Sequence, residues 1–256
     1  MKVSCKVTLI EHTPIPQELV ASAAKLCYSS SSVDDIVTGE KSSDSDKYIN
    51  KLMTMGHHSP FEHVSFTFGI EGVSRSFLAQ MTRHRIASYS VQSQRYVDCG
   101  NGDFSFIVPP SIQGIPELEA DYDNAMKTAI DTYNRIADEL ERRYIEENPT
   151  ANRASLRKKA IEDARFVLPN ATETKMIATF NARSLFNFFS LRCCRRAQWE
   201  IRDVAMKMYK LVYDIAPSIF EKSGPSCVSC GKCNEGRMSC GLSNIVIDEF
   251  NNIKGA

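Results

Sequence analysis

The sequence predicts an α+β protein, because strand-like and helix-like hydrophobic patterns alternate along the chain. Residues 64–70 place Val, Phe, Phe and Ile at every second position, which is typical of a half-buried strand. Residues 171–181 favour another strand through alternation and Thr content, and residues 3–11 favour a third. Long helical segments separate them. With no repeat and no low-complexity linker, the simplest partition is one domain at 1–220 and a Cys-rich tail at 221–256.

The other elements follow from periodicity and from start and stop signals. We expect helices at residues 17–27, 45–56, 74–83, 116–147, 155–166, 183–193 and 197–214. Residues 30–45 are rich in Ser, Asp and Gly and are expected to form a surface loop. Ser59-Pro60-Phe61-Glu62 has the pattern of a capping box, so one helical turn should lead into the strand that begins at residue 64.

Composition limits the classes of function. The chain has 256 residues, with 31 Lys plus Arg and 31 Asp plus Glu, so a large electrostatic surface for nucleic acid is not expected. No apolar run approaches the roughly 20 residues of a membrane helix, and the first residues lack the apolar core of a secretory signal. The nine cysteines are scattered or gathered in the tail, and we expect reduced thiols in a cytoplasmic protein.

The segment 83–96 is the most informative part of the chain. It reads RHRIASYSVQSQRY and gathers three arginines, a histidine and several hydroxyls. Arginine presents a planar fork of donors that matches phosphate oxygens, and hydroxyls add further donors. A chain without net charge that concentrates cations here is predicted to bind an anion here.

Two other interpretations of this segment stay open on composition. It could be a solvated basic loop that makes surface ion pairs of little energetic value. It could also be a nucleic-acid-binding module without catalysis, although such modules place exposed aromatic side chains beside a basic groove. Neither a phosphate-binding Gly-x-x-x-x-Gly-Lys loop nor a Gly-x-Gly-x-x-Gly fingerprint occurs, so a nucleotide cofactor would bind outside a Rossmann unit.

Three more segments could carry chemistry. His57, His58 and His63 lie close to Glu62, but their spacing does not favour a metal site, and turn capping is the simpler explanation. In the aromatic helix 183–192, helical spacing places Arg183, Asn187 and Leu191 on one stripe. Arg183 and Arg192 need partners if they are buried. An ion pair with Glu200 or Asp203 would supply one, and a ligand would supply another. Arg165 lies at a helix end, where a cation stabilises the helix dipole.

Together these segments resemble the flavin-dependent thymidylate synthases. The resemblance rests on Arg83-His84-Arg85-x2-Ser88-x4-Ser93-x-Arg95, on Ser59-Pro60-Phe61-Glu62-His63 and on Asn181-Ala182-Arg183-Ser184-Leu185, in the family's order. It covers about residues 3–220. It implies a mostly antiparallel sheet packed against several helices. It also implies a homotetramer with shared active sites that methylates dUMP to dTMP. Methylenetetrahydrofolate would be the carbon donor, FAD the hydride carrier and NADPH the reductant.

The resemblance also implies roles for individual residues. Arg192 matches the residue that activates the uracil base, and His57 matches a histidine that handles the folate or a proton near the flavin. Flavin-binding positions match Ser59, Arg83, His84, Arg85, Val91, Asn181, Arg183 and Asn187. Positions that bind dUMP match Gln80, Arg83, Val91, Gln92, Ser93, Gln94, Arg95, Arg165 and Arg192. No cysteine matches a nucleophile.

The sequence departs from the family at several positions. Many members carry Asn-Glu where this chain has Ser90-Val91, so any contact at Val91 must come from the backbone. Gln94 replaces a frequent glycine. The role of Cys193 and Cys194 is open. The tail's Cys227-x2-Cys230-x2-Cys233-x6-Cys240 could ligate a metal, but it is not a standard pair of knuckles, and free or disulfide-paired thiols are the alternative. No metal is expected in the active site.

Overall fold

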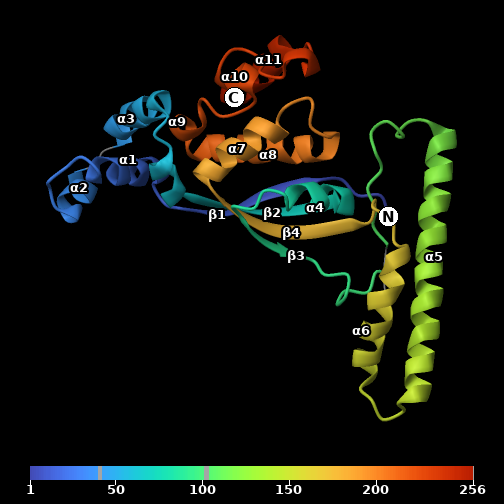
Figure 1. The fold of residues 1–256 in the computed structure, drawn as a ribbon. Helices are drawn as coiled ribbons and strands as arrows, with labels where there is room; N and C mark the ends of the chain where they lie inside the picture. Colours follow the sequence, from blue (N-terminus) through green and yellow to red (C-terminus); the bar gives the residue numbers. More distant parts are fainter. Residues whose placement is uncertain (40–41, 101–103, 256) are drawn as a thin grey trace. The chain divides into compact units, whose positions relative to one another are not determined.

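The computed structural model describes residues 1–39, 42–100 and 104–255, and it shows an α+β fold (Figure 1). A four-stranded sheet has the order β1-β2-β4-β3. Its strands are β1 (Lys6–His12), β2 (Ser65–Ser74), β4 (Glu173–Asn181) and β3 (Ser88–Val91). The predicted fold class is confirmed.

Each neighbouring pair of strands is antiparallel, as their hydrogen bonds show. The amide of Thr13 donates to the carbonyl oxygen of Ser65 over 3.0 Å, which joins the end of β1 to the start of β2. The hydroxyls of Thr67 and Thr179 lie 2.9 Å apart and join β2 to β4. The amide of Gln92 donates to Lys175 over 2.9 Å, next to β3. Alternate residues of β2 are buried, as the sequence pattern predicts.

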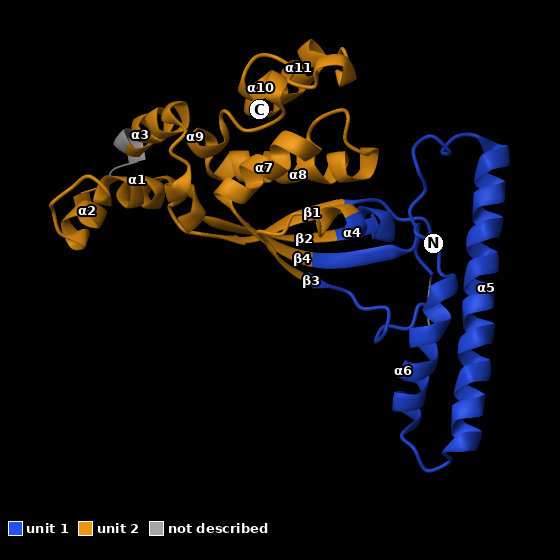
Figure 2. Ribbon diagram, viewed as in Figure 1, with its two compact units in different colours: residues 1–5, 71–79, 90–176 blue, residues 6–70, 80–89, 177–256 orange. Residues whose placement is uncertain are grey.

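The chain divides into two compact units (Figure 2). Unit 1 comprises residues 1–5, 71–79 and 90–176, and unit 2 comprises residues 6–70, 80–89 and 177–256. The helices of unit 2 are α1 (Pro16–Leu26), α2 (Val33–Gly39), α3 (Ser42–Met55), η1 (Ser59–His63), α7 (Ala182–Arg192), α8 (Trp199–Ile215), α9 (Pro217–Phe220), α10 (Ser226–Ser229), η3 (Gly236–Met238) and α11 (Ser243–Lys254). The helices of unit 1 are α5 (Pro116–Glu147), α6 (Arg153–Ala164) and η2 (Arg165–Val167), and α4 (Arg75–Met81) begins in unit 1 and ends in unit 2.

Aromatic side chains fill the core of unit 2. Phe189 packs edge-on against Tyr209 of α8 and against Phe220, with ring centroids 5.5 and 6.0 Å apart. Phe220 also contacts Phe66 of β2 at 5.4 Å. Such pairs add roughly 0.5–1.5 kcal/mol each beyond the burial of their area. They fix α7, which carries Arg183 and Arg192, against the sheet.

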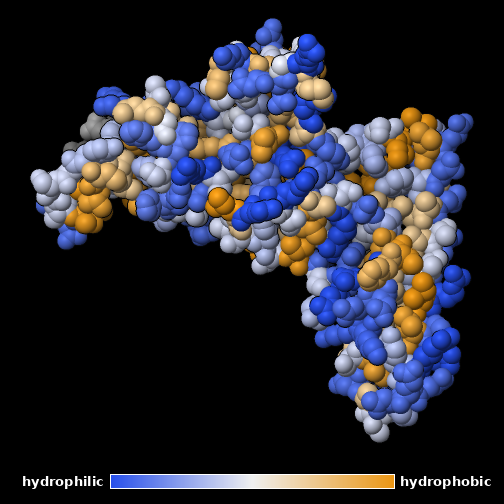
Figure 3. Space-filling model, viewed as in Figure 1, coloured by the Kyte–Doolittle hydropathy of each residue, from blue (hydrophilic) through white to orange (hydrophobic). Residues whose placement is uncertain are grey.

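Unit 1 is a helical hairpin joined to strand ends. Helix α5 packs along α6 through Tyr133, Ala137, Ile161 and Ala164, all buried. Arg157 of α6 pairs with Asp98 over 2.7 Å. Figure 3 shows hydrophobic surface along this helix pair.

The helices and strands expected from periodicity are confirmed with shifts of a few residues at their ends. The surface loop predicted at 30–45 is wrong, because α2 and the start of α3 occupy the described part of that range. Residues 40–41 lie outside the described residues. In α2, Ile36 is buried, and the hydroxyl of Ser32 accepts from the amide of Asp35 over 3.1 Å at the helix start. A Ser before two acidic residues is therefore a helix start here rather than a loop signal.

The capping box at Ser59 is also wrong. The single helical turn is present as η1, but its N-cap is His58, which makes no side-chain capping bond. Glu62 pairs instead with Arg183, across unit 2. Glu62 thus forms an ion pair with Arg183 rather than a hydrogen bond to the backbone at the start of η1.

We expect Gly72→Ala to destabilise the protein strongly. Gly72 has a φ of +67°, and a Cβ there would lie 2.0 Å from the backbone oxygen of Ser4. The left-handed conformation alone costs a non-glycine residue roughly 1–2 kcal/mol, and the clash with backbone adds to it. Thermal unfolding should show a melting temperature lower by at least about 4 °C. Gly69→Ala is the matched control, because its Cβ would meet only the flexible side chain of Ile10. Equal melting temperatures for the two variants would contradict this account.

Candidate active site

A cationic pocket of about 590 Å³ lies within unit 2. Its volume is in the range of small-molecule sites. It is lined by Glu62, Arg83, His84, Arg85, Ile86, Phe180, Asn181, Arg183, Ser184, Asn187, Leu191 and Arg192. Seven of the residues predicted to bind ligands therefore come together here, from two separate segments, 83–85 and 181–192.

Helix α7 supplies one side of the pocket. Asn181 ends β4 and caps the helix, since its side-chain oxygen accepts from the amide of Ser184 over 2.8 Å. The helix then presents Arg183, Asn187 and Leu191 on one stripe, as the spacing predicts. The opposite face of α7 is held in the core by Phe188 and Phe189, both fully buried. Thus the aromatic residues of this helix fix the polar ones.

The RHR segment supplies the other side. This segment comprises Arg83, His84 and Arg85, which follow the end of α4. The backbone amides of Arg83 and His84 donate to the carbonyl oxygens of Gln80 and Met81. The hydroxyl of Tyr89 lies 3.0 Å from the carbonyl oxygen of Met81 and 2.8 Å from that of His84. Burial raises the pKa of Tyr89 to about 12, so it keeps its proton and remains a donor. This hydroxyl therefore holds the RHR turn against α4.

A hydrogen bond between the side chains of Arg192 and His84 joins the two walls of the pocket. Nε of Arg192 donates to Nε2 of His84 over 2.9 Å. A ring nitrogen that accepts a hydrogen bond carries no proton, so His84 is neutral in this arrangement. Burial first, and then the charge of Arg192, lower the pKa of His84 to about 4. The ring of His84 also packs on Phe188, with centroids 4.9 Å apart. His84 thus orients the Arg192 guanidinium without competing for its charge.

The pocket carries four arginines and one carboxylate among the described residues that line it. Glu62 forms an ion pair with Arg183, and both side chains are about half exposed. The sequence suggests Glu200 or Asp203 as the partner of Arg183, but the partner is Glu62. Asp203 pairs instead with Lys207 over 2.5 Å. Burial and the nearby Arg83 lower the pKa of Arg192, a sign that cations are crowded here. Such a site favours anionic ligands.

A second group of predicted residues comes together within unit 1. Nε of Arg95 lies 2.6 Å from the Glu162 carboxylate, and Nε of Arg165 donates to the Glu162 carbonyl oxygen over 3.1 Å. The hydroxyl of Ser93 accepts from the amide of Arg95 over 3.2 Å. The side-chain amide nitrogen of Gln94, Nε2, is buried without a hydrogen-bond partner. Two guanidinium groups and spare donors thus face one small region, as an anion site requires.

The remaining predicted residues lie outside the cationic pocket. Ser59 lies in η1, Gln80 in α4, and Val91 and Gln92 at the end of β3. His57 is exposed, whereas the neighbouring His58 packs against Phe61 and Phe186 with centroids 6.2 and 5.7 Å apart. Burial, and then Arg183, lower the pKa of His58. No three His, Cys, Asp or Glu side chains in the described part of the chain are arranged around a single metal ion.

Sequence reasoning missed several lining residues. Glu62 was assigned to helix capping, although an arginine at the start of an aromatic helix implies a carboxylate partner elsewhere. Ile86, Phe180 and Ser184 also line the pocket. Ser184 could have been found from its position three residues before Asn187 on the helix.

Comparison with known proteins identifies the family. The family model described as "Thymidylate synthase complementing protein" matches residues 8–218. The chain belongs to this family. A relative from Clostridium tetani, named flavin-dependent thymidylate synthase, is 52% identical over 236 residues, covering 92% of this chain and 93% of the relative. A Geobacter sulfurreducens protein of the same name is 46% identical, with 92% and 94% covered.

A solved structure shares the fold of this chain. It is the UMP/dUMP methylase PolB from Streptomyces cacaoi bound with 5-Br dUMP. It has a TM-score of 0.66 and 24% identity, and it covers 86% of this chain and 95% of its own. The family model and the first relatives extend over most of the chain, but they do not test the boundary predicted at residue 220, which stays a prediction.

In this family member, we expect His84 to make stability depend on pH. Its folded pKa of about 4 lies below the ordinary value of 6.5. Between these values the unfolded chain binds more protons, so His84 contributes stability above pH 6.5 that is lost as the pH falls towards 4. Melting temperatures of the protein and of His84→Gln, measured at pH 7 and pH 5, test this. The variant should lose less stability on acidification, and an equal loss in both proteins would contradict the neutral state of His84.

Proposed function

We propose that this protein is a flavin-dependent thymidylate synthase that methylates dUMP to dTMP. Methylenetetrahydrofolate is the carbon donor, FAD the hydride carrier and NADPH the reductant. The observation that carries the proposal is the cationic pocket formed by the RHR segment and α7 in a chain of this family. The first relatives are named for this activity.

The lining of this pocket supports a flavin dinucleotide as the ligand. Its pyrophosphate is anionic, and Arg83, His84 and Arg85 line the wall that faces α7. Asn181, Arg183 and Asn187 offer amide and guanidinium donors to the rest of the cofactor. Ser59, and the backbone at Val91, complete the proposed flavin set. When bound, FAD supplies the hydride that completes the methyl group.

Arg192 is the proposed activating residue. A guanidinium beside the N3 and O4 edge of uracil favours the form that has lost the N3 proton, and it stabilises charge that develops when C5 attacks. The hydrogen bond from its Nε to His84 leaves the two terminal nitrogens of Arg192 for the base. His57 is proposed to handle the folate or a proton near the flavin.

The dUMP phosphate is assigned to Ser93, Arg95 and Arg165, with the backbones of Val91, Gln92 and Gln94. Ser93 and Arg95 already lie together. Arg165 donates to the backbone carbonyl oxygen of Glu162, and Arg95 pairs with the carboxylate of the same residue. Gln80 and Arg83 are assigned further nucleotide contacts. The exposed pair between Arg95 and Glu162 is weak enough for a phosphate to displace the carboxylate.

A homotetramer with active sites shared between subunits is proposed from membership of the family. No described helix is long and apolar enough to cross a membrane. We propose a cytoplasmic location.

Spectroscopy and turnover test the function. The purified protein should be yellow, NADPH should bleach it, and dUMP with methylenetetrahydrofolate should restore the oxidised flavin as dTMP forms. A colourless protein that cannot be reconstituted with FAD would exclude this enzyme. Binding of single-stranded nucleic acid in place of flavin would favour the binding-module interpretation instead.

A further inference from the structure

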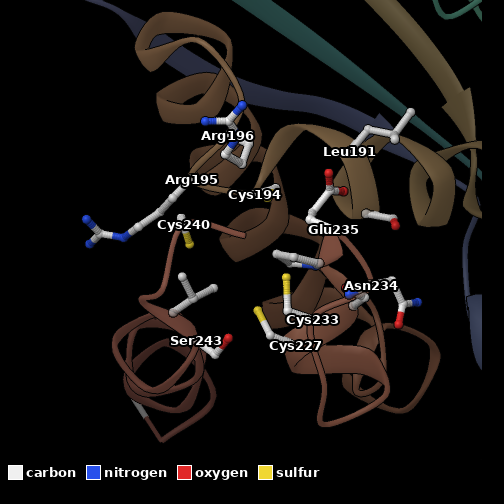
Figure 4. A pocket seen from close by; sticks show the side chains of 14 residues that line it. Leu191, Cys194, Arg195, Arg196, Cys227, Cys233, Asn234, Glu235, Cys240 and Ser243 are labelled. Atoms are coloured by element: carbon white, nitrogen blue, oxygen red, sulfur yellow. The ribbon is translucent and has the colours of Figure 1, made fainter. Parts of the chain in front are cut away.

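Four cysteine side chains line one cavity of about 130 Å³ within unit 2, apart from the cationic pocket (Figure 4). They are Cys194, Cys227, Cys233 and Cys240. Figure 4 shows Cys227 and Cys233 beside each other and Cys240 at another side of the cavity. All are free thiols. The cavity therefore brings together cysteines that are far apart in the sequence, since Cys194 and Cys240 are 46 positions apart.

The structure selects these four from the cysteines of this region. Cys194 follows α7 directly, Cys227 lies in α10, and Cys233 and Cys240 lie on the segments before and after η3. Cys230 is exposed and absent from the lining, although it belongs to the tail motif. Cys193 is buried in the core, where burial raises the pKa of its thiol. The sequence grouping of four tail cysteines thus changes, with Cys194 in the place of Cys230.

The four thiols do not form a site for a single metal ion within the described part of the chain. No three of the described His, Cys, Asp or Glu side chains are arranged around a single metal ion, which argues against a mononuclear zinc site. The cavity volume is roughly ten times the space that one water molecule needs. Iron–sulfur clusters are held by four cysteine thiolates, and four cysteines line this cavity.

The surroundings suit an anionic group. Thiolate ligands make such a cluster negative, and Arg195 and Arg196 lie in the cavity lining. Glu235 also lines it, but this residue is exposed and hence solvated. Helix α11 closes the cavity through Ser243 and Val246 and is anchored by Glu249, which pairs with Arg195 and with Arg202 of α8. The tail is therefore folded around the thiols rather than extended from the domain.

We propose that this cavity binds an iron–sulfur cluster through the thiolates of Cys194, Cys227, Cys233 and Cys240. Iron and inorganic sulfide are the co-reactants, and each thiol releases its proton when its sulfur binds iron. Because Cys194 is two positions after Arg192, the cluster would fasten the tail to the end of the helix that carries the proposed activating residue. The site does not depend on the proposed dUMP chemistry.

The full-length protein, purified without oxygen, tests the proposal. We expect iron and acid-labile sulfide in equal amounts, with a visible absorbance that persists after the flavin is removed. Replacing Cys194 or Cys233 by serine should remove most of the iron. Cys230→Ser is the matched control and should keep it. Flavin content and circular dichroism of each variant show whether it is folded.

Several results would overturn the proposal. Protein that is folded but free of iron, both as purified and after incubation with ferrous iron and sulfide, excludes the cluster. Zinc without sulfide, or a disulfide among the four cysteines, excludes it as well. Loss of iron in Cys230→Ser together with its retention in Cys194→Ser overturns the ligand set. None of these outcomes depends on whether dTMP is formed, so a failure here is distinct from a failure of the proposed function.

Discussion

Replacing Arg192 by alanine should abolish most methyl transfer while the flavin stays bound. The guanidinium is the group placed to stabilise negative charge on the uracil ring, and removing one such donor typically lowers kcat by about 10²–10³. Flavin should stay because Arg83, Arg85 and Arg183 line the pocket independently of Arg192. Turnover of dUMP, and the rate at which reduced flavin is oxidised in a single turnover, measure the effect.

Two controls separate catalysis from packing. Arg192→Lys keeps a charge but not the planar donors, so it should restore only part of the rate. Arg143→Ala removes an exposed guanidinium on α5 that pairs with Glu139, and its turnover should match that of the unmodified protein. The pKa of His84, followed by NMR, should rise in Arg192→Ala because a neighbouring cation is lost. Turnover of Arg192→Ala close to that of the unmodified protein would refute the assigned role.

The elements that position the site were predictable because their patterns are strong. Strand β2 places large apolar residues at alternate positions from Phe66 to Ile70, and α7 buries Leu185, Phe188 and Phe189. In both elements the buried positions carry apolar residues, so the spacing of apolar residues in the sequence predicts which positions are buried. The stripe of Arg183 and Asn187 followed from the same helical geometry. The antiparallel arrangement came from the family resemblance, and the register hydrogen bonds agree with it.

Partners and short elements were not predictable in the same way. Strand β3 has four residues within a polar segment, and its pairing depends on β4 rather than on its own pattern. Arg157 of α6 binds Asp98 and two carboxylates of α5, Asp138 and Glu141, which no local spacing reveals. The same holds for Glu62 and Cys194, because the residues that they contact lie far away in the sequence. Long-range polar contacts carry little local signal, and they are where sequence reasoning failed here.

Replacing Arg95 by alanine should weaken dUMP binding selectively. Its guanidinium lies 2.6 Å from Glu162, and Ser93 and Arg165 are close by in the same unit. A hydrogen bond to a charged group contributes roughly 1.5–3 kcal/mol, so we expect the Kd for dUMP to rise about 10- to 100-fold. Deoxyuridine lacks the phosphate, and its weaker binding should not change. Calorimetry with both ligands measures the difference.

Glu162→Gln should act in the opposite direction. The carboxylate competes with phosphate for Arg95, and this exposed pair contributes only about 0.2–1 kcal/mol, so removing the charge should tighten dUMP binding by a few-fold at most. Lys158→Ala is the matched control, because this lysine lies over the ring of Tyr96 beside Arg95 without belonging to the proposed phosphate group. Equal weakening of dUMP and deoxyuridine in Arg95→Ala would show that Arg95 supports the fold of the segment rather than the phosphate. Opposite effects of the two variants on dUMP alone would place the phosphate at the atoms that Glu162 now occupies.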